Sequence, residues 1–157
     1  MSARDDEDAR FADADRGPLR LVAFDTEDLR VISALVQDAV LEAGEMRYLA
    51  GARRFALLVN RFRWEGGTRM PERVRTMLVV EGVRAVRRQG IDPDARDVVL
   101  SLLSLAWDGG EDAAGRLVLT FAGDGAVAVE ADALEVVLHD ATQPYVAPSG
   151  KAPRHPD

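Results

Sequence analysis

The sequence contains no cysteine, only two histidines and a single lysine, Lys151. A chain without cysteine forms no disulfide bond and offers no thiolate for a metal, an iron–sulfur cluster or nucleophilic catalysis. Two histidines are too few for a typical zinc site. The sequence also has no Gly-x-Ser-x-Gly, P-loop, Gly-x-Gly-x-x-Gly or His-Glu-x-x-His motif. We therefore expect neither a metal nor a cofactor.

Long hydrophobic runs are absent too. The apolar stretches are short and interrupted by Asp, Arg or Gly, far below the roughly 20 residues that a membrane-spanning helix needs. The first residues are acidic, whereas a signal peptide begins with basic residues. These features predict a cytoplasmic protein that does not bind membranes. The net charge of -7 makes nucleic acid a less favoured partner than an acidic protein or a small anion.

The length of 157 residues, 47% of them hydrophobic, suits one domain with one core. Residues 1–17 contain six acids and three arginines but few large apolar side chains, which predicts a disordered acidic tail. Residues 143–157 contain four prolines and one glycine, a composition typical of a Pro-rich tail. Residues 18–142 are the predicted α+β domain.

One amphipathic helix is predicted from about Asp28 to Ala43. Acidic residues at positions 25–28 suit the positive end of a helix dipole, and Gly44 is a stop signal. Apolar residues recur at intervals of three and four between these signals.

The rest of the domain follows the two-residue period of strands. We expect six to eight strands in a mostly antiparallel sheet, a sandwich or partial barrel, with the helix packed on it. Gly82 predicts a bulge, and Asp124-Gly125 predicts a hairpin. Residues 131–139 fit either a strand or a helix.

Residues 55–59 read Phe-Ala-Leu-Leu-Val and are apolar at every position. Successive side chains of a strand point to opposite faces of its sheet. This run therefore predicts a central strand that is covered on both faces, between the helix and another layer.

Charge is distributed unevenly. Residues 46–91 contain eleven arginines and three acids, a net charge of +8, and the rest of the chain carries -15. Guanidinium groups bind carboxylates and phosphates through paired hydrogen bonds. We interpret the segment as an arginine-rich sheet face of a non-enzymatic binding or adaptor domain, which contacts an acidic protein or another anion. Phe62 and Trp64 lie nearby for stacking. The assigned residues are Arg61, Arg63, Arg73, Arg75, Arg84, Arg87 and Arg88.

Other interpretations of the same residues stay open. In one alternative, the acids of residues 92–140 pair with the arginines of the same molecule. The acidic residues 1–17 are another occupant of the arginine surface. A third alternative is a homo-oligomer in which the basic half of one copy meets the acidic half of another at a sheet edge. The last is a cofactor-free enzyme, which requires a pocket that brings His139 together with an acid and an arginine.

Several segments together resemble a known family. They are PLRLVAFDTEDLRVISALVQDAV, RRFALLVNRFRWE, VRAVRRQGID, LTFAGDGAVAVEADALEVVLHD and the closing HPD. In these segments the chain resembles an uncharacterised alphaproteobacterial family, domain of unknown function 2948, from Leu19 to Asp157. The resemblance implies a cytoplasmic bacterial protein, and it implies no activity, ligand or catalytic residue.

Overall fold

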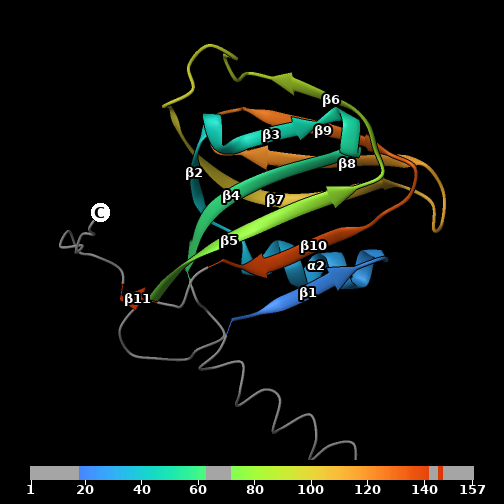
Figure 1. Ribbon diagram of the computed structural model, residues 1–157, viewed down its shortest axis with the longest axis horizontal. Coiled ribbons are helices and arrows are strands. Elements are labelled where there is room, and N and C mark those ends of the chain that lie inside the picture. Colours follow the sequence, from blue (N-terminus) through green and yellow to red (C-terminus); the bar gives the residue numbers. More distant parts are fainter. Residues whose placement is uncertain (1–17, 63–71, 142–144, 147–157) are drawn as a thin grey trace, which may run out of the picture.

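The computed structural model describes residues 18–62, 72–141 and 145–146 (Figure 1). These residues form one open, mostly antiparallel sheet of 11 strands and one α-helix, α2 (Thr26–Leu35). The strands are β1 (Arg20–Ala23), β2 (Val40–Glu42), β3 (Met46–Leu49), β4 (Arg54–Phe62), β5 (Glu72–Glu81), β6 (Val83–Gln89), β7 (Val99–Gly109), β8 (Gly115–Phe121), β9 (Ala126–Ala131), β10 (Val136–Asp140) and β11 (Tyr145–Val146). Short 3-10 helices span Ala43–Glu45 and Ala50–Ala52.

The predicted α+β class is confirmed. The expected number of six to eight strands was too low, because the three residues of β2 and the two residues of β11 are too short for a periodic pattern. Strand β11 pairs with β5 and falls in the range predicted as the Pro-rich tail. The predicted disordered tail, residues 1–17, lies outside the described residues.

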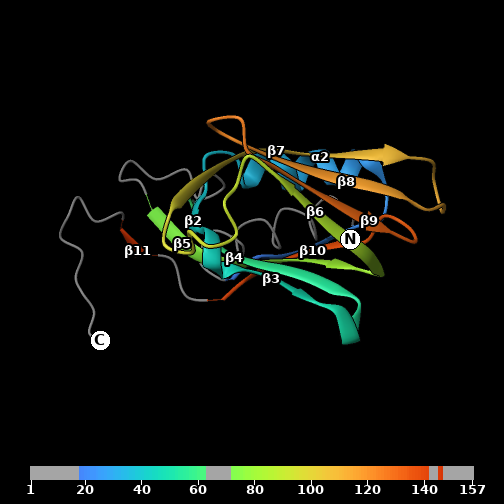
Figure 2. The same ribbon diagram turned by 90° about the horizontal axis from the view of Figure 1, so that it is seen from above.

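The sheet runs in the order β1-β10-β5-β4-β2-β7-β8-β9-β6, with β3 beside β4 and β11 beside β5. It is curled, so that β1, β10, β5 and β4 form one layer and β7, β8, β9 and β6 form a second layer facing it (Figure 2). Strand β2 joins the layers by pairing with both β4 and β7. At Gly82, where a bulge was predicted, the chain bends with a φ of 69° and passes from β5 in one layer directly into β6 at the edge of the other. The register of β6 against β9 then shifts between Val83 and Ala85.

The core lies between the two layers, and α2 closes it against β1 and β7. Helix α2 contributes Leu29 and Ile32, the two helical residues that are fully buried. The inward-facing strand residues alternate with outward-facing ones, as one buried face per strand requires. The large buried side chains from the strands include Phe55, Leu57, Leu78, Leu138, Leu102, Leu117, Leu119 and Phe121.

The predicted helix starts correctly but ends too late. Asp25 caps α2 by accepting a hydrogen bond from the Asp28 N–H at 2.8 Å. The helix stops at Leu35, and Asp38 adopts a left-handed φ of 67°. The Asp38 N–H then donates to the Leu102 carbonyl at 2.7 Å, which starts the pairing that continues in β2. The helical period predicted too long a helix because Val36 and Ala39 are buried at helical spacing, although both residues lie after the end of α2.

The hairpin prediction at Asp124-Gly125 is confirmed, and one alternative is settled. Asp124, with a φ of 71°, lies in the hairpin between β8 and β9. The range 131–139, which fitted a strand or a helix, leads into the strand β10.

The prediction for residues 55–59 holds on one face only. Strand β4 is central in its layer, and its inward residues Phe55, Leu57 and Val59 are fully buried. Its outward residues Ala56 and Leu58 are only partly buried. In the described part of the chain no helix or strand covers this outer face (Figure 2).

An ion pair is buried at one end of the first layer. Arg61 on β4 and Asp140 on β10 have fully buried side chains, and Arg61 Nη2 donates to Asp140 Oδ1 and Oδ2 at 3.0 and 3.1 Å. Thr76 on β5 donates to Asp140 Oδ1 at 2.8 Å and accepts from Arg61 Nε at 3.1 Å. The Leu19 N–H donates to Asp140 Oδ2 at 2.8 Å. This network therefore links four neighbouring stretches of chain.

Replacing Asp140 with alanine is expected to lower the free energy of unfolding by about 3–5 kcal/mol, because it leaves the Arg61 charge buried without its carboxylate. The matched control is Asp97→Ala, at an exposed aspartate, with an expected change within about 0.5 kcal/mol. Urea unfolding followed by circular dichroism measures both. A loss for Asp140→Ala no larger than for the control would show that the pair does not stabilise the fold.

Candidate functional site

A groove crosses the outer face of the second layer, over β6, β9 and β8. It has a volume of about 500 Å³. Its lining residues are Arg87, Arg88, Gln89, Arg116, Val118, Ala126 and Ala128. It is the candidate functional site, and we call it the arginine groove.

The register of the three strands explains the shape of the groove. Arg87 on β6 pairs with Ala128 on β9, and Ala128 pairs with Val118 on β8. Gln89 pairs with Ala126 in the next outward-facing row. Strand β9 thus presents the methyl groups of Ala126 and Ala128 between the longer side chains of β6 on one side and β8 on the other. Because neighbouring strands lie about 4.8 Å apart, the two walls are roughly 10 Å apart.

Arginines from two strands line this groove. Arg87 and Arg88 come from β6, and Arg116 comes from β8. The one acid in the same outward rows is Glu130, whose Oε2 lies 3.2 Å from Arg116 Nη2 and 3.5 Å from Arg87 Nε. Arg88 is exposed and forms no ion pair within the described residues. The groove therefore combines an apolar floor with excess positive charge.

A second depression, of about 340 Å³, lies on the other side of Glu130. Arg84, Asp108, Arg116 and Glu130 supply its charged lining. Two acids balance its two arginines, so this depression lacks the excess charge of the groove.

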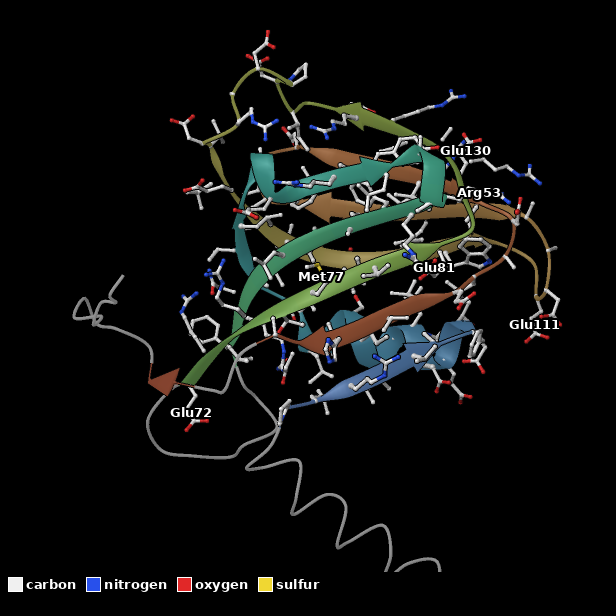
Figure 3. The ribbon with its side chains drawn as sticks, viewed as in Figure 1. Arg53, Glu72, Met77, Glu81, Glu111 and Glu130 are labelled. Carbon is white, nitrogen blue, oxygen red and sulfur yellow. The ribbon has the colours of Figure 1, made fainter. Side chains whose placement is uncertain are left out.

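A charged cluster at the β9–β10 turn adjoins this depression. Arg84 Nε donates to Asp132 Oδ1 at 2.5 Å, and Arg53 Nη2 donates to Asp132 Oδ2. Arg84 and then Arg53 hold the pKa of the Asp132 carboxyl below its usual range, because their hydrogen bonds favour the charged form. Figure 3 shows Arg53 and Glu130 on the same side of the molecule.

The seven arginines assigned from the sequence do not share one face. Arg61 is fully buried against Asp140, so its placement on a binding surface was wrong. Its position is inward because Arg61 has the same parity as Val59 and Leu57 on β4. Arg63 lies outside the described residues, as does Trp64.

The other five form two separate groups. Arg73 and Arg75 lie on β5 in the first layer, and the Arg73 guanidinium carbon is 4.3 Å from the centroid of the Phe62 ring. Phe62 thus contacts an arginine of its own chain. Arg84, Arg87 and Arg88 lie on β6 at the edge of the second layer. The groove brings together only Arg87 and Arg88 of the predicted set.

Sequence reasoning missed Arg116 and the acids of the second layer. Arg116 falls outside the basic segment 46–91, and only the β8–β9–β6 register brings it to the groove, where it pairs with Glu130 one outward row from Arg87. Asp132 pairs with Arg53 and Arg84, and Glu130 with Arg87, all more than 40 residues away in the sequence. The available signal was the two-residue period of Leu117 and Leu119, which places Arg116 on the opposite, outward face of its strand.

His139 is exposed on the outer face of the first layer, between Arg20 on β1 and Met77 on β5. Its neighbour Asp140 points inward, as alternation on a strand requires. His139 lines neither of the two depressions described above. Neither of these depressions is therefore the pocket that the enzyme alternative requires.

The groove and the curled sheet define an α+β domain with a basic surface site. A family model described as "Protein of unknown function (DUF2948)" matches residues 19–155, so the chain belongs to this family. No curated protein and no solved structure matches the chain. Among the described residues, no helix is long and apolar enough to cross a membrane, and no three His, Asp or Glu side chains gather as metal ligands.

The lowered pKa of Asp132 predicts a pH effect with a definite sign. A carboxyl whose pKa is lower in the folded state stabilises that state above its unfolded pKa, and the contribution is lost as the pH falls through the folded pKa. We expect Arg84→Met to raise the pKa of Asp132 toward its usual range, as measured by NMR titration of the side-chain carboxyl. Arg30→Met, on the exposed face of α2, is the control. An Asp132 titration that is the same in both variants would contradict the assignment.

Proposed function

We propose that this protein is a non-enzymatic binding domain whose arginine groove holds an acidic segment of a partner protein. The observation that carries the proposal is the excess of arginine over acid around an apolar floor. Arg87, Arg88 and Arg116 line the groove, and Glu130 is the acid beside them. Guanidinium groups can bind carboxylates through two hydrogen bonds each.

The floor favours a peptide over a polyanion. Val118, Ala126 and Ala128 offer apolar contact for the aliphatic side chains of an acidic segment. Glu130 and the net charge of -7 repel any anion, and a chain of phosphates, which binds mainly through charge, gains less than an acidic and aliphatic segment from the apolar floor to offset this repulsion. A partner in which acidic and aliphatic residues alternate matches both the walls and the floor.

Binding is tested with a fluorescein-labelled peptide that alternates glutamate with valine and serine, by fluorescence anisotropy at low salt. We expect the native chain to bind it and Arg87→Glu/Arg88→Glu to bind at least about tenfold more weakly, which corresponds to 1.4 kcal/mol. Arg30→Glu is the matched control, because Arg30 is also exposed but lies on α2, away from the groove.

Three outcomes would contradict this function. The native chain fails to bind the peptide, the groove variant and the Arg30 variant lose the same affinity, or the glutamine version of the peptide binds equally well. Tighter binding of a single-stranded oligonucleotide than of the peptide would make nucleic acid the ligand instead.

A further inference from the structure

The outer face of the first layer is apolar where a solvated sheet face is usually polar. Its middle rows run across four strands, from Val22 through Val137 and Val79 to Ala56. The next row contains Met77 and Leu58, and Figure 3 shows Met77 on the side facing the viewer. All six side chains are partly exposed. We call these residues the apolar face.

Basic side chains surround one end of the apolar face. Arg20 and His139 continue the row of Met77, Arg75 lies in the row beyond it, and Arg47 pairs with Ala56 at the opposite side. The acids Glu81 and Glu135 lie at the other end, where Glu81 is paired with Arg54. A second copy packed face to face with its basic end on this basic end would bring the same arginines together, so the charge disfavours that arrangement.

The chain itself carries a segment that complements this face. Residues 1–17 contain six acids, four of them consecutive at 5–8, and Phe11 is their one aromatic residue. The segment joins the domain at Leu19, whose N–H donates to Asp140, and continues into Arg20 at the basic end of the apolar face. Gly17-Pro18 is a dipeptide typical of turns, so the chain can reverse direction there.

The distances allow the contact. Leu58 lies three strands away from Arg20, roughly 14 Å at the usual strand spacing. Phe11 lies nine positions before Arg20, and an extended chain of that length spans about 30 Å.

We propose that residues 5–15 dock on the apolar face, with their carboxylates on Arg20 and Arg75 and with Phe11 against Met77 and Leu58. The docked segment would cover the outer face of β4, and residues 55–59 would then be covered on both faces of the sheet, as their apolar sequence predicts. Covalent attachment gives it an effective concentration that a free partner lacks. The proposal does not rest on the arginine groove, which lies on the outer face of the other layer.

The absence of cysteine allows a single label to be placed in the full-length chain. A nitroxide on Ala9→Cys is expected to broaden the amide NMR signals of Met77, Leu58 and His139 and to leave those of Ala128 and Val118 in the groove sharp. About 1 M salt should remove the broadening, because it reduces the screening length to roughly 3 Å. Changing the four acids at 5–8 to their amides should remove it at low salt too.

Double variants of the arginines on each face provide a second test. Arg20→Gln/Arg75→Gln should abolish most of the broadening, whereas Arg87→Gln/Arg88→Gln should keep it. Broadening of the groove signals, or no selective broadening at all, would overturn the proposal. Broadening that appears only when spin-labelled and isotope-labelled chains are mixed would mean that the segment binds a second copy, and it would overturn intramolecular docking as well.

Discussion

The buried ion pair between Arg61 and Asp140 is the constraint on which the first layer depends. A fully buried guanidinium must have its charge and its hydrogen bonds matched, and here β4, β5, β10 and the entry to β1 supply the partners. A shift of β10 by one residue would turn Asp140 outward and leave Arg61 unmatched. The pair thus fixes the register of the strands that carry the apolar face, and its carboxylate also holds the backbone at Leu19, just before β1.

The same need for matched charge explains how the uneven sequence becomes a folded surface. Acids from β9 and the turn after it pair with arginines of β6 and with Arg53, which directly precedes β4, so that Asp132 binds Arg53 and Arg84 and Glu130 contacts Arg87. Internal pairing, one of the alternatives raised by the sequence, accounts for these residues. Internal ion pairing does not extend along the groove, because the outward residues of β9 beyond Glu130 are the alanines Ala128 and Ala126 rather than acids.

Much of the fold follows from local patterns, and the site does not. The capping carboxylate Asp25, the bend at Gly82 and the turn at Asp124 act within a few residues, so the sequence indicates them directly. The end of α2 depends on a hydrogen bond from Asp38 to the distant Leu102, which no local pattern contains. Arg61 was misplaced for a related reason, because its partner Asp140 lies 79 residues away.

The two outer faces differ in the size of their central side chains, and this difference decides what each can bind. Alanines between arginine-bearing strands leave space for a ligand to enter between the walls, so the second layer has a groove. Met77, Val79 and Leu58 fill the corresponding space in the first layer, which leaves a surface suited to being covered rather than entered. Both faces carry arginine, and the apolar pattern beneath the charge is what separates the proposed site for an external segment from the proposed site for the chain's own.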